Sequence, residues 1–453
     1  MKLVEGILQD SHMAGGHVAL QWEGKSYTYE EMARQVDILV QNFQRRGLPG
    51  SVWGIRLSDP VQQLFYFLAA EKAGAVPLLL HEYLKGEDIS ALLQERPMDG
   101  LLSDTPWEGI PWTEVGKVYI YEKRKGTGRK GFGVLTSGSS GLPKVYFRRD
   151  ESWSDFFPAQ NEIFHIGRES KLYLQGSMAF TGNLNMALAF LWEGATVVGT
   201  AKVRPRQWMA DIEKEHITHV YMIPSKLSVL SRVQGGAEDV THILTGSQLM
   251  TEKVLSALES QFPNSQTILY YGASEMSYVS YIEGEDIRKH PDSVGKPFPG
   301  ISLSIQDGEI YVSTPYGIEG AHQPMTCHDL GRLDAEGNLH FLGRREDVYH
   351  VKGNHVSRQK VLSHLLMLPG IDEAELLGVK EPHGDDRICA FLVGEQKLED
   401  RELVHYLKEK LQSWEIPSRF IWLSRIPRTS TGKSDRKKLE KIIASSQYPV
   451  VSS

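Results

Sequence analysis

The sequence predicts an α/β fold, in which a large N-terminal domain of layered α/β subdomains precedes a small α+β C-terminal domain. Three observations support this prediction. The chain has 453 residues, which exceeds what one hydrophobic core normally serves. Short apolar runs alternate with helical patterns through the first three quarters, as in open sheets with parallel strands. Beyond about Asp347 the pattern changes. We therefore expect domains at 1–345 and 346–453.

The first recognisable helix begins at Asp59-Pro60. An aspartate can accept hydrogen bonds from the first free backbone amides, and proline suits the first helical turn. Apolar side chains three and four residues apart then mark one buried face, and Gly74 is a typical helix stop. The apolar run 75–80 follows as the next strand.

The same alternation continues in the middle of the chain. Strands are expected at 218–223, 242–244 and 267–270, with a helix at 251–262 between the last two. Ligands of open α/β sheets bind beyond the carboxyl ends of the strands. The loops at 246–248 and 272–275 are therefore candidate site segments.

The C-terminal part reads as a compact α+β unit of small-domain size. Its expected helices span 357–368 and 401–412, and its expected strands lie at 374–379, 388–393 and 419–423. Neither an internal repeat nor a low-complexity segment is visible.

Composition excludes several classes of function. A net charge of −7 from 50 basic and 57 acidic residues does not favour a nucleic-acid partner. No apolar run reaches the ~18 residues of a membrane span, and the N-terminus lacks the apolar core of a signal peptide. Two cysteines cannot build a disulfide framework or a metal site. We expect a cytoplasmic protein; its oligomeric state is not readable.

The stretch from Thr136 to Lys144, Thr-Ser-Gly-Ser-Ser-Gly-Leu-Pro-Lys, is the most informative in the chain. Glycines let a backbone approach a ligand, and exposed amides and hydroxyls with one lysine suit a polyphosphate. It is not a Walker loop, because Ser139 stands where that motif needs lysine and a strand is expected to follow. A flexible Ser/Gly surface loop is the alternative interpretation.

Four motifs occur in a fixed order. They are the loop 136–144, Tyr271-Gly272-Ala273-Ser274-Glu275, the block from Asp329-Leu330-Gly331-Arg332 to Gly343-Arg344-Arg345-Glu346-Asp347, and Pro427-Arg428-Thr429-Ser430-Thr431-Gly432-Lys433. Together, over nearly the whole chain, they resemble the adenylate-forming superfamily of acyl-CoA synthetases, peptide-synthetase adenylation domains and luciferases. The resemblance implies an acyl-CoA synthetase-like fold and an AMP-forming ligase. Such an enzyme joins ATP and a carboxylic acid into acyl-AMP and pyrophosphate, and then passes the acyl group to a thiol.

The resemblance also implies a role for each matching residue. The β- and γ-phosphates of ATP would be held by Lys144 with the loop residues Thr136, Ser137, Gly138, Ser139, Ser140 and Gly141. Glu275 would bind Mg²⁺ beside phosphate oxygens and water, and Ser274 would touch the α-phosphate. The adenine would lie between Tyr271-Gly272 and the segment Gly246, Ser247 and Gln248. Asp329 and Arg344 would hold the ribose hydroxyls, although Cys327-His328 replaces the usual Thr-Gly before this aspartate.

The last motif implies how the acid and the thiol are handled. Lys433 would bridge the acid's carboxylate and the ribose, and the C-terminal domain would swing about a hinge at Glu346 between the two half-reactions. Gly353 matches the glycine that lets the pantetheine arm of CoA pass. Arg358 and Lys360 replace the family's Pro and Glu, and their positive charge would suit the phosphates of CoA.

The nature of the acid is bounded by the segment 177–183. It contains no carboxylate to pair with a substrate ammonium, so an α-amino acid is disfavoured. A fatty or aryl acid is favoured, with Phe180 at the position of the family's acyl-site aromatic. Met178, Met186 and Phe190 could line a tunnel or belong to the core. Three functions stay open: an acid–CoA ligase, an enzyme that loads a carrier protein, and a nucleotide-binding relative without thioester formation.

Overall fold

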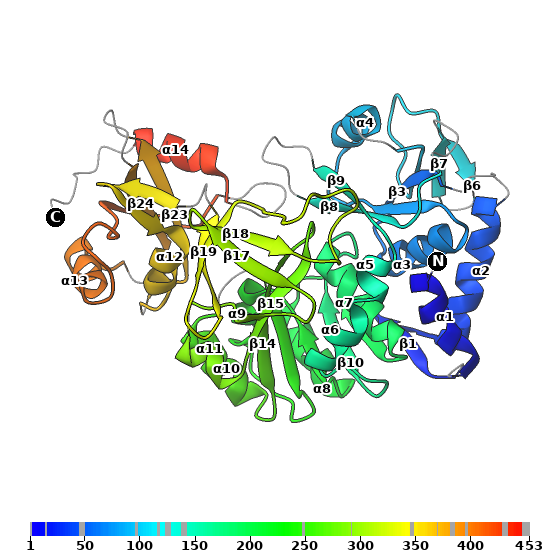
Figure 1. The fold of residues 1–453 in the computed structure, drawn as a ribbon, viewed down its shortest axis with the longest axis horizontal. Coiled ribbons are helices and arrows are strands. Elements are labelled where there is room, and N and C mark those ends of the chain that lie inside the picture. The colour runs from blue at the N-terminus through cyan, green and yellow to red at the C-terminus, as the bar shows by residue number, and fades with distance from the viewer. Residues whose placement is uncertain are drawn as a thin grey trace. The chain divides into compact units, whose positions relative to one another are not determined.

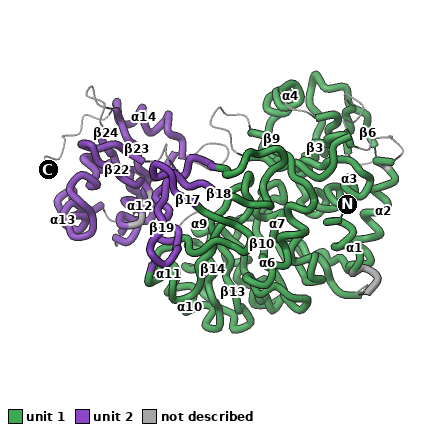
Figure 2. The backbone as a smooth tube through the Cα atoms, viewed as in Figure 1, with its two compact units in different colours: residues 1–289, 294–303, 312–325 green, residues 290–293, 304–311, 326–453 purple. Residues whose placement is uncertain are grey.

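Two compact units make up this computed structural model (Figure 1, Figure 2). It describes residues 2–13, 16–44, 50–95, 98–115, 118–122, 128–136, 143–246, 250–290, 292–344, 348–368, 370–380, 386–394, 397–427 and 434–445. Unit 1 comprises 1–289, 294–303 and 312–325, and unit 2 comprises 290–293, 304–311 and 326–453. This division does not show which parts of the chain move together. The domain boundary expected between residues 345 and 346 therefore stays a prediction.

Within its described residues, unit 1 carries a nine-stranded sheet. In spatial order the strands are β16 (Lys296–Pro297), β15 (Ser277–Glu283), β14 (Gln266–Ala273), β13 (His242–Gly246), β12 (His219–Tyr221), β10 (Lys171–Gln175), β11 (Thr196–Thr200), β1 (Val18–Trp22) and β2 (Lys25–Thr28). The six strands from β14 to β1 are parallel, and antiparallel neighbours flank them. The carboxyl ends of the parallel strands therefore share one edge.

The second sheet of unit 1 has seven strands in the described ranges. Their order is β6 (Thr113–Val115), β7 (Val118–Glu122), β5 (Gly100–Ser103), β3 (Val52–Arg56), β4 (Val76–Leu79), β8 (Phe132–Thr136) and β9 (Lys144–Arg148). The central strands β5, β3, β4 and β8 are parallel. This confirms the predicted layered α/β architecture with largely parallel sheets.

Helices cover both sheets of unit 1. They are α1 (Lys2–Met13), α2 (Tyr29–Gln44), α3 (Pro60–Lys72), α4 (Gly86–Glu95), α5 (Glu151–Ser154), α6 (Phe157–Ile163), α7 (Thr181–Trp192), α8 (Pro205–Lys214), α9 (Pro224–Leu230), α10 (Glu252–Gln261) and α11 (Glu285–Lys289). The expected cap of α3 is present, because the Asp59 carboxylate accepts a 2.9 Å hydrogen bond from the Val61 amide.

Unit 2 combines antiparallel strands with helices. Its described strands are β19 (Asp329–Leu333), β20 (Leu339–Arg344), β21 (Val348–Val351), β22 (Asn354–Ser357), β23 (Glu373–Lys380), β24 (Asp386–Val393) and β25 (Arg419–Trp422); β17 (Ser302–Gln306) and β18 (Glu309–Ser313) contribute to the sheet of β19 and β20. Its described helices are α12 (Arg358–Leu366), α13 (Asp400–Lys410) and α14 (Arg436–Ser445). The predicted C-terminal α+β elements are confirmed to within a few residues.

Candidate active site

The loop predicted to bind phosphate joins two antiparallel strands. Thr136 ends β8, Lys144 begins β9, and the two residues are directly opposed. Lys144 is exposed and Thr136 is half-buried. A strand follows the loop, as predicted, which separates this hairpin from the strand–helix geometry of a Walker loop. The predicted residues Ser137, Gly138, Ser139, Ser140 and Gly141 lie outside the described residues.

The second predicted segment lies at the carboxyl end of β14. Tyr271 pairs with Ser280 of β15, and the register shifts between Tyr271 and Gly272. A Cβ atom at Gly272 would lie 2.4 Å from the backbone oxygen of Ser277, so only glycine allows this close strand crossing.

Ser274 and Glu275 form that turn. The Ser274 hydroxyl donates a 3.1 Å hydrogen bond to the hydroxyl of Thr181, the first residue of α7. The backbone oxygen of Glu275 accepts a hydrogen bond from the Ile318 amide at 2.9 Å. Both side chains are half-buried. The turn that is expected to meet the α-phosphate and Mg²⁺ therefore has a defined backbone.

Arg148 forms a hydrogen bond to the backbone of the same turn. Its side chain is 1% exposed, and it donates to the Ser274 carbonyl oxygen at 2.6 Å, to the Tyr316 carbonyl oxygen and to the Ser277 hydroxyl. Burial lowers the pKa of Arg148 to about 9, an effect opposed by the nearby charge of Glu275. Sequence reasoning missed this residue, because nothing distinguishes Arg148 from Arg149 beside it.

Gly246 ends β13 and pairs with Tyr270. A Cβ atom there would lie 2.5 Å from the Tyr270 ring, so the strand end needs glycine to pass this aromatic side chain. The structure thus places Gly246 beside the strand that carries Tyr271, as the adenine prediction requires. Ser247 and Gln248 lie outside the described residues.

The expected acyl-site residue Phe180 precedes α7 and is 46% exposed. The ring of His81 lies over it with centroids 4.5 Å apart, and His81 also stacks on Tyr83. Burial lowers the pKa of His81 to about 4, so this imidazole is neutral at physiological pH. Met178, Met186 and Phe190 are fully buried, which supports the core interpretation over the tunnel.

Unit 2 contains the predicted ribose pair. Asp329 and Arg344 are directly opposed on β19 and β20, with Arg344 Nε 3.6 Å from Asp329 Oδ1. His328 adopts a φ of 60°, a conformation that favours glycine, and its ring contacts Glu309 at 2.8 Å. The histidine that replaces the family's glycine thus keeps the glycine-like backbone.

The residues predicted to face CoA lie on the hairpin β21–β22 and on α12. Gly353 has a φ of 77° and Lys352 a φ of 51°, which is the backbone of a tight two-residue hairpin turn, and no atom lies within 4 Å of a Cβ built on Gly353. Arg358 forms an ion pair with Glu375, and Lys360 pairs with Glu415 at 2.8 Å. The charge expected to suit CoA phosphates is therefore already matched by buried carboxylates.

Lys433 and Glu346 lie outside the described residues, whereas the residues on either side of 428–433 are described. The Asp435 amide donates a 2.8 Å hydrogen bond to the Pro427 carbonyl oxygen. The Ser434 hydroxyl donates to Glu375, the carboxylate that also binds Arg358.

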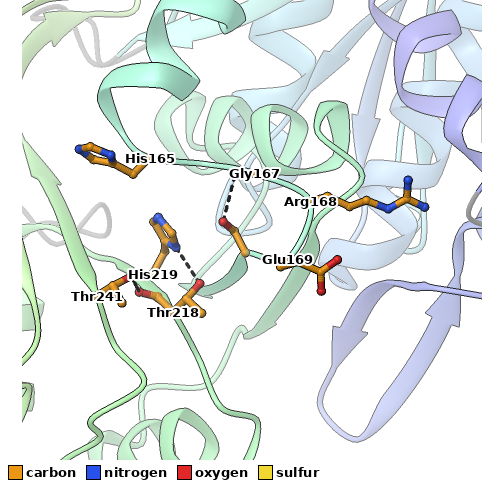
Figure 3. A pocket seen from close by; sticks show the side chains of 8 residues that line it. His165, Gly167, Arg168, Glu169, Thr218, His219 and Thr241 are labelled. Carbon is orange, nitrogen blue, oxygen red and sulfur yellow. Dashed lines mark hydrogen bonds between the residues drawn. The ribbon is translucent and has the colours of Figure 1, made fainter.

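A cavity of ≈390 Å³ lies elsewhere in unit 1 (Figure 3). It is lined by His165, Gly167, Arg168, Glu169, Ser170, Thr218, His219 and Thr241. These residues precede or begin β10, β12 and β13, so the cavity opens at the amino ends of the strands. Because ligands of parallel sheets bind at the carboxyl ends, this cavity is separate from the predicted site.

The Glu275 carboxylate is a suitable ligand for the expected Mg²⁺ ion. Among the described residues there is no group of three or more His, Cys, Asp or Glu side chains that could hold a metal ion. Mg²⁺ needs no such cage, since it is commonly bound by one or two carboxylates together with phosphate oxygens and water. Glu275 is the carboxylate that the sequence predicts for this role.

Comparison with known proteins identifies the family. The AMP-binding enzyme family matches residues 133–320, and the AMP-binding enzyme C-terminal domain matches 362–433. The chain is 27% identical over 335 residues to the uncharacterized acyl-CoA ligase YhfT of Bacillus subtilis, covering 69% of each chain. It is 24% identical to the putative long chain fatty acid-CoA ligase VraA of Staphylococcus haemolyticus, covering 96% of each.

A solved structure shares the fold. o-Succinylbenzoate CoA synthetase (MenE) of Bacillus subtilis, in complex with ATP and magnesium ion, matches with a TM-score of 0.83 and 21% identity over 96% of this chain and 99% of that one. The predicted acyl-CoA synthetase-like fold and the prediction of an AMP-binding enzyme are confirmed. The two relatives are acyl-CoA ligases by name, and the matching structure of MenE holds ATP and magnesium ion. Among the helices that the structure describes, none combines the length and apolar character needed to span a bilayer. The chain belongs to the adenylate-forming superfamily of AMP-binding enzymes.

Proposed function

We propose that this enzyme activates a fatty or aryl carboxylic acid as acyl-AMP and then transfers the acyl group to CoA. The observation that carries the proposal is the turn of Ser274 and Glu275 at the carboxyl end of β14. Its hydroxyl meets the first turn of α7, and its backbone is held by Arg148. The first half-reaction requires a polar turn with an oxygen ligand beside the segment that binds the acid, which is predicted at 177–183.

The first step joins two anions, so charge and position provide most of the catalysis. Lys144 and the loop 136–141 would neutralise the β- and γ-phosphates, and Glu275 would hold Mg²⁺, which would offset further negative charge of the phosphates. The acid's carboxylate oxygen attacks the α-phosphorus while the bond to pyrophosphate breaks. Ser274 donates to the α-phosphate, where negative charge accumulates.

The nucleoside is held by complementary groups. Tyr271 offers an aromatic face to adenine, and Gly246 and Gly272 let the neighbouring chain segments pack closely at this edge of the sheet. Asp329 accepts the ribose hydroxyls, with Arg344 opposite it on the neighbouring strand. Lys433 bridges the ribose and the entering carboxylate.

The second step needs the thiolate of CoA to attack the acyl carbonyl and release AMP. We propose that the domain from residue 346 onward turns about Glu346, which withdraws Lys433 and brings Gly353 to the pantetheine arm. The open space at Gly353 supports this role. Because Arg358 and Lys360 are ion-paired, we expect them to stabilise α12 rather than to bind CoA.

The acceptor and the acid are tested together. Pyrophosphate release is measured for a panel of fatty and aryl acids, and AMP release is then measured with free CoA or with a holo-carrier protein. CoA-dependent AMP release supports the proposal; acceleration by the carrier alone supports a loading enzyme. Acyl-AMP formation without any thiol dependence indicates a relative that lacks thioester formation.

Lys433→Ala provides the sharpest single variant. We expect roughly two to three orders of magnitude less adenylation, the scale for losing one transition-state contact. Lys437→Ala, four residues further along the same basic tail, is the matched control. Near-normal pyrophosphate exchange in Lys433→Ala would refute the assignment. We place the activity in the cytoplasm, because ATP and CoA are available there. Its reducing conditions also suit the two cysteines, neither of which forms a disulfide.

A further inference from the structure

Lys226 carries a charge that the adenylation chemistry described above does not use. It lies in the first turn of α9, directly after β12. Its ammonium donates a 3.1 Å hydrogen bond to the backbone oxygen of Gln175, the last residue of β10. A Cβ atom on Gly176 would lie 3.5 Å from the same ammonium. Lys226 therefore points across the carboxyl ends of two parallel strands, the edge where ligands bind.

Contacts connect Lys226 to the turn of Ser274 and Glu275. Gly182 belongs to segment 177–183 and packs closely against Tyr221 at the end of β12. A Cβ atom on Gly182 would lie 2.3 Å from the Tyr221 hydroxyl. The neighbour of Gly182, Thr181, receives the hydrogen bond from Ser274. The Tyr221 hydroxyl also contacts that of Tyr270 at 2.8 Å. Asn183, also in the first turn of α7, donates a hydrogen bond to the same Gln175 carbonyl oxygen as Lys226, so the start of α7 links the Ser274 turn to the surroundings of Lys226.

Among the residues that the structure describes, no carboxylate pairs with Lys226. Across the described ranges it forms no ion pair, and one backbone carbonyl is the acceptor that the structure gives it. Burial lowers the pKa of Lys226 to about 8, with no neighbouring charge contributing. A desolvated ammonium is costly unless an anion or several acceptors compensate it. The missing compensation is supplied most directly by a ligand.

We propose that Lys226 binds a second carboxylate on the acid substrate, so that the enzyme prefers dicarboxylic acids to monocarboxylic acids of the same length. This inference rests on the proposed function and assigns the substrate class within it. The other anions of the reaction have their own cations, because Lys144 serves the phosphates and Lys433 the reacting carboxylate. Segment 177–183 contains no carboxylate to pair with a substrate ammonium, and the positive charge of Lys226 would repel one.

The test compares matched acids in matched variants. Pairs of mono- and dicarboxylic acids with the same fatty or aryl skeleton are assayed for pyrophosphate release by the wild type, Lys226→Met and Lys226→Arg. Lys202→Met is the control, since this exposed lysine follows the neighbouring strand β11 and already pairs with Glu23 at 2.7 Å. Thermal stabilisation by each acid in the presence of a non-hydrolysable ATP analogue gives a readout independent of turnover.

We expect wild type to prefer the dicarboxylates and Lys226→Met to lose roughly 10- to 100-fold in kcat/KM for them, the scale of one hydrogen bond between charged groups. Monocarboxylates keep their rates, and Lys226→Arg keeps the preference. Equal losses for both acid classes would assign Lys226 to the nucleotide and overturn the inference, as would a wild type that prefers monocarboxylates. If no acid is adenylated, the proposed function fails. Dicarboxylate-specific thermal stabilisation that disappears in Lys226→Met then still supports the site, and its absence overturns it.

Discussion

The strongest prediction concerns Arg148, the buried residue beneath the Ser274–Glu275 turn. In Arg148→Met the Ser274 carbonyl oxygen loses its donor, and the Tyr316 carbonyl oxygen keeps the Ser277 hydroxyl as its donor. A buried acceptor left without a partner costs about 1–3 kcal/mol. Removing a buried charge returns part of that cost, so we expect about 1–3 kcal/mol less stability. Arg148→Lys keeps the charge but loses the planar fork that reaches several acceptors at once, and we expect an intermediate loss.

The same change should impair catalysis through Mg²⁺. A shift of the turn by about 1 Å displaces Glu275, and misplacement on that scale costs about 100-fold in rate. The assays are urea unfolding and pyrophosphate release as a function of Mg²⁺ concentration. Arg148→Lys should raise the Mg²⁺ concentration needed for half-maximal rate, which a loss of stability alone would not do. Arg149→Lys changes the exposed neighbour and serves as the control. Wild-type stability and Mg²⁺ dependence in Arg148→Lys would refute the reasoning.

Three further predictions follow from the described contacts. Gly272→Ala places a methyl group 2.4 Å from the backbone oxygen of Ser277, and we expect about 1–3 kcal/mol lower stability with weaker ATP binding by calorimetry. Burial lowers the pKa of His219 to about 3, so its stabilising contribution is complete above pH 6.5. That contribution falls by about 1.4 kcal/mol per pH unit as the pH drops toward 3, a slope that His219→Gln should remove from unfolding curves. Glu375→Gln weakens the anchor of Ser434 and should slow adenylation roughly 10-fold without abolishing folding, measured by pyrophosphate release and thermal unfolding.

Each of these predictions has a control or a contradicting result. Gly167→Ala adds a methyl group where no atom lies within 4 Å and should be neutral. For His219, parallel stability curves between pH 6 and pH 4 would contradict the assignment; the stacked rings of His165 and His242 remain in both proteins. Glu409→Gln changes an exposed carboxylate on α13. Equal slowing in Glu409→Gln and Glu375→Gln would show that the Ser434 anchor is not responsible.

The sequence by itself determined the features that depend on nearby residues. Asp59 and Pro60 define the start of α3 because a cap needs only its own first turn. The order of the four motifs identified the superfamily, and the glycines marked strand ends such as Gly246 and Gly272. These signals are local, since backbone conformation and turn chemistry act within a few residues.

Only the tertiary structure revealed the groups that act over long separations. Arg148 meets Ser274 across 126 residues, and Lys226 meets the end of β10 across 51. In the sequence both look like ordinary surface cations, because burial and the presence or absence of a partner are properties of the packed chain. The same holds for Arg358 and Lys360. Their charge is expected from the sequence to suit CoA phosphates, but in the structure they pair with Glu375 and Glu415. Charge in a protein has a role only through its neighbours, and folding decides which residues those are.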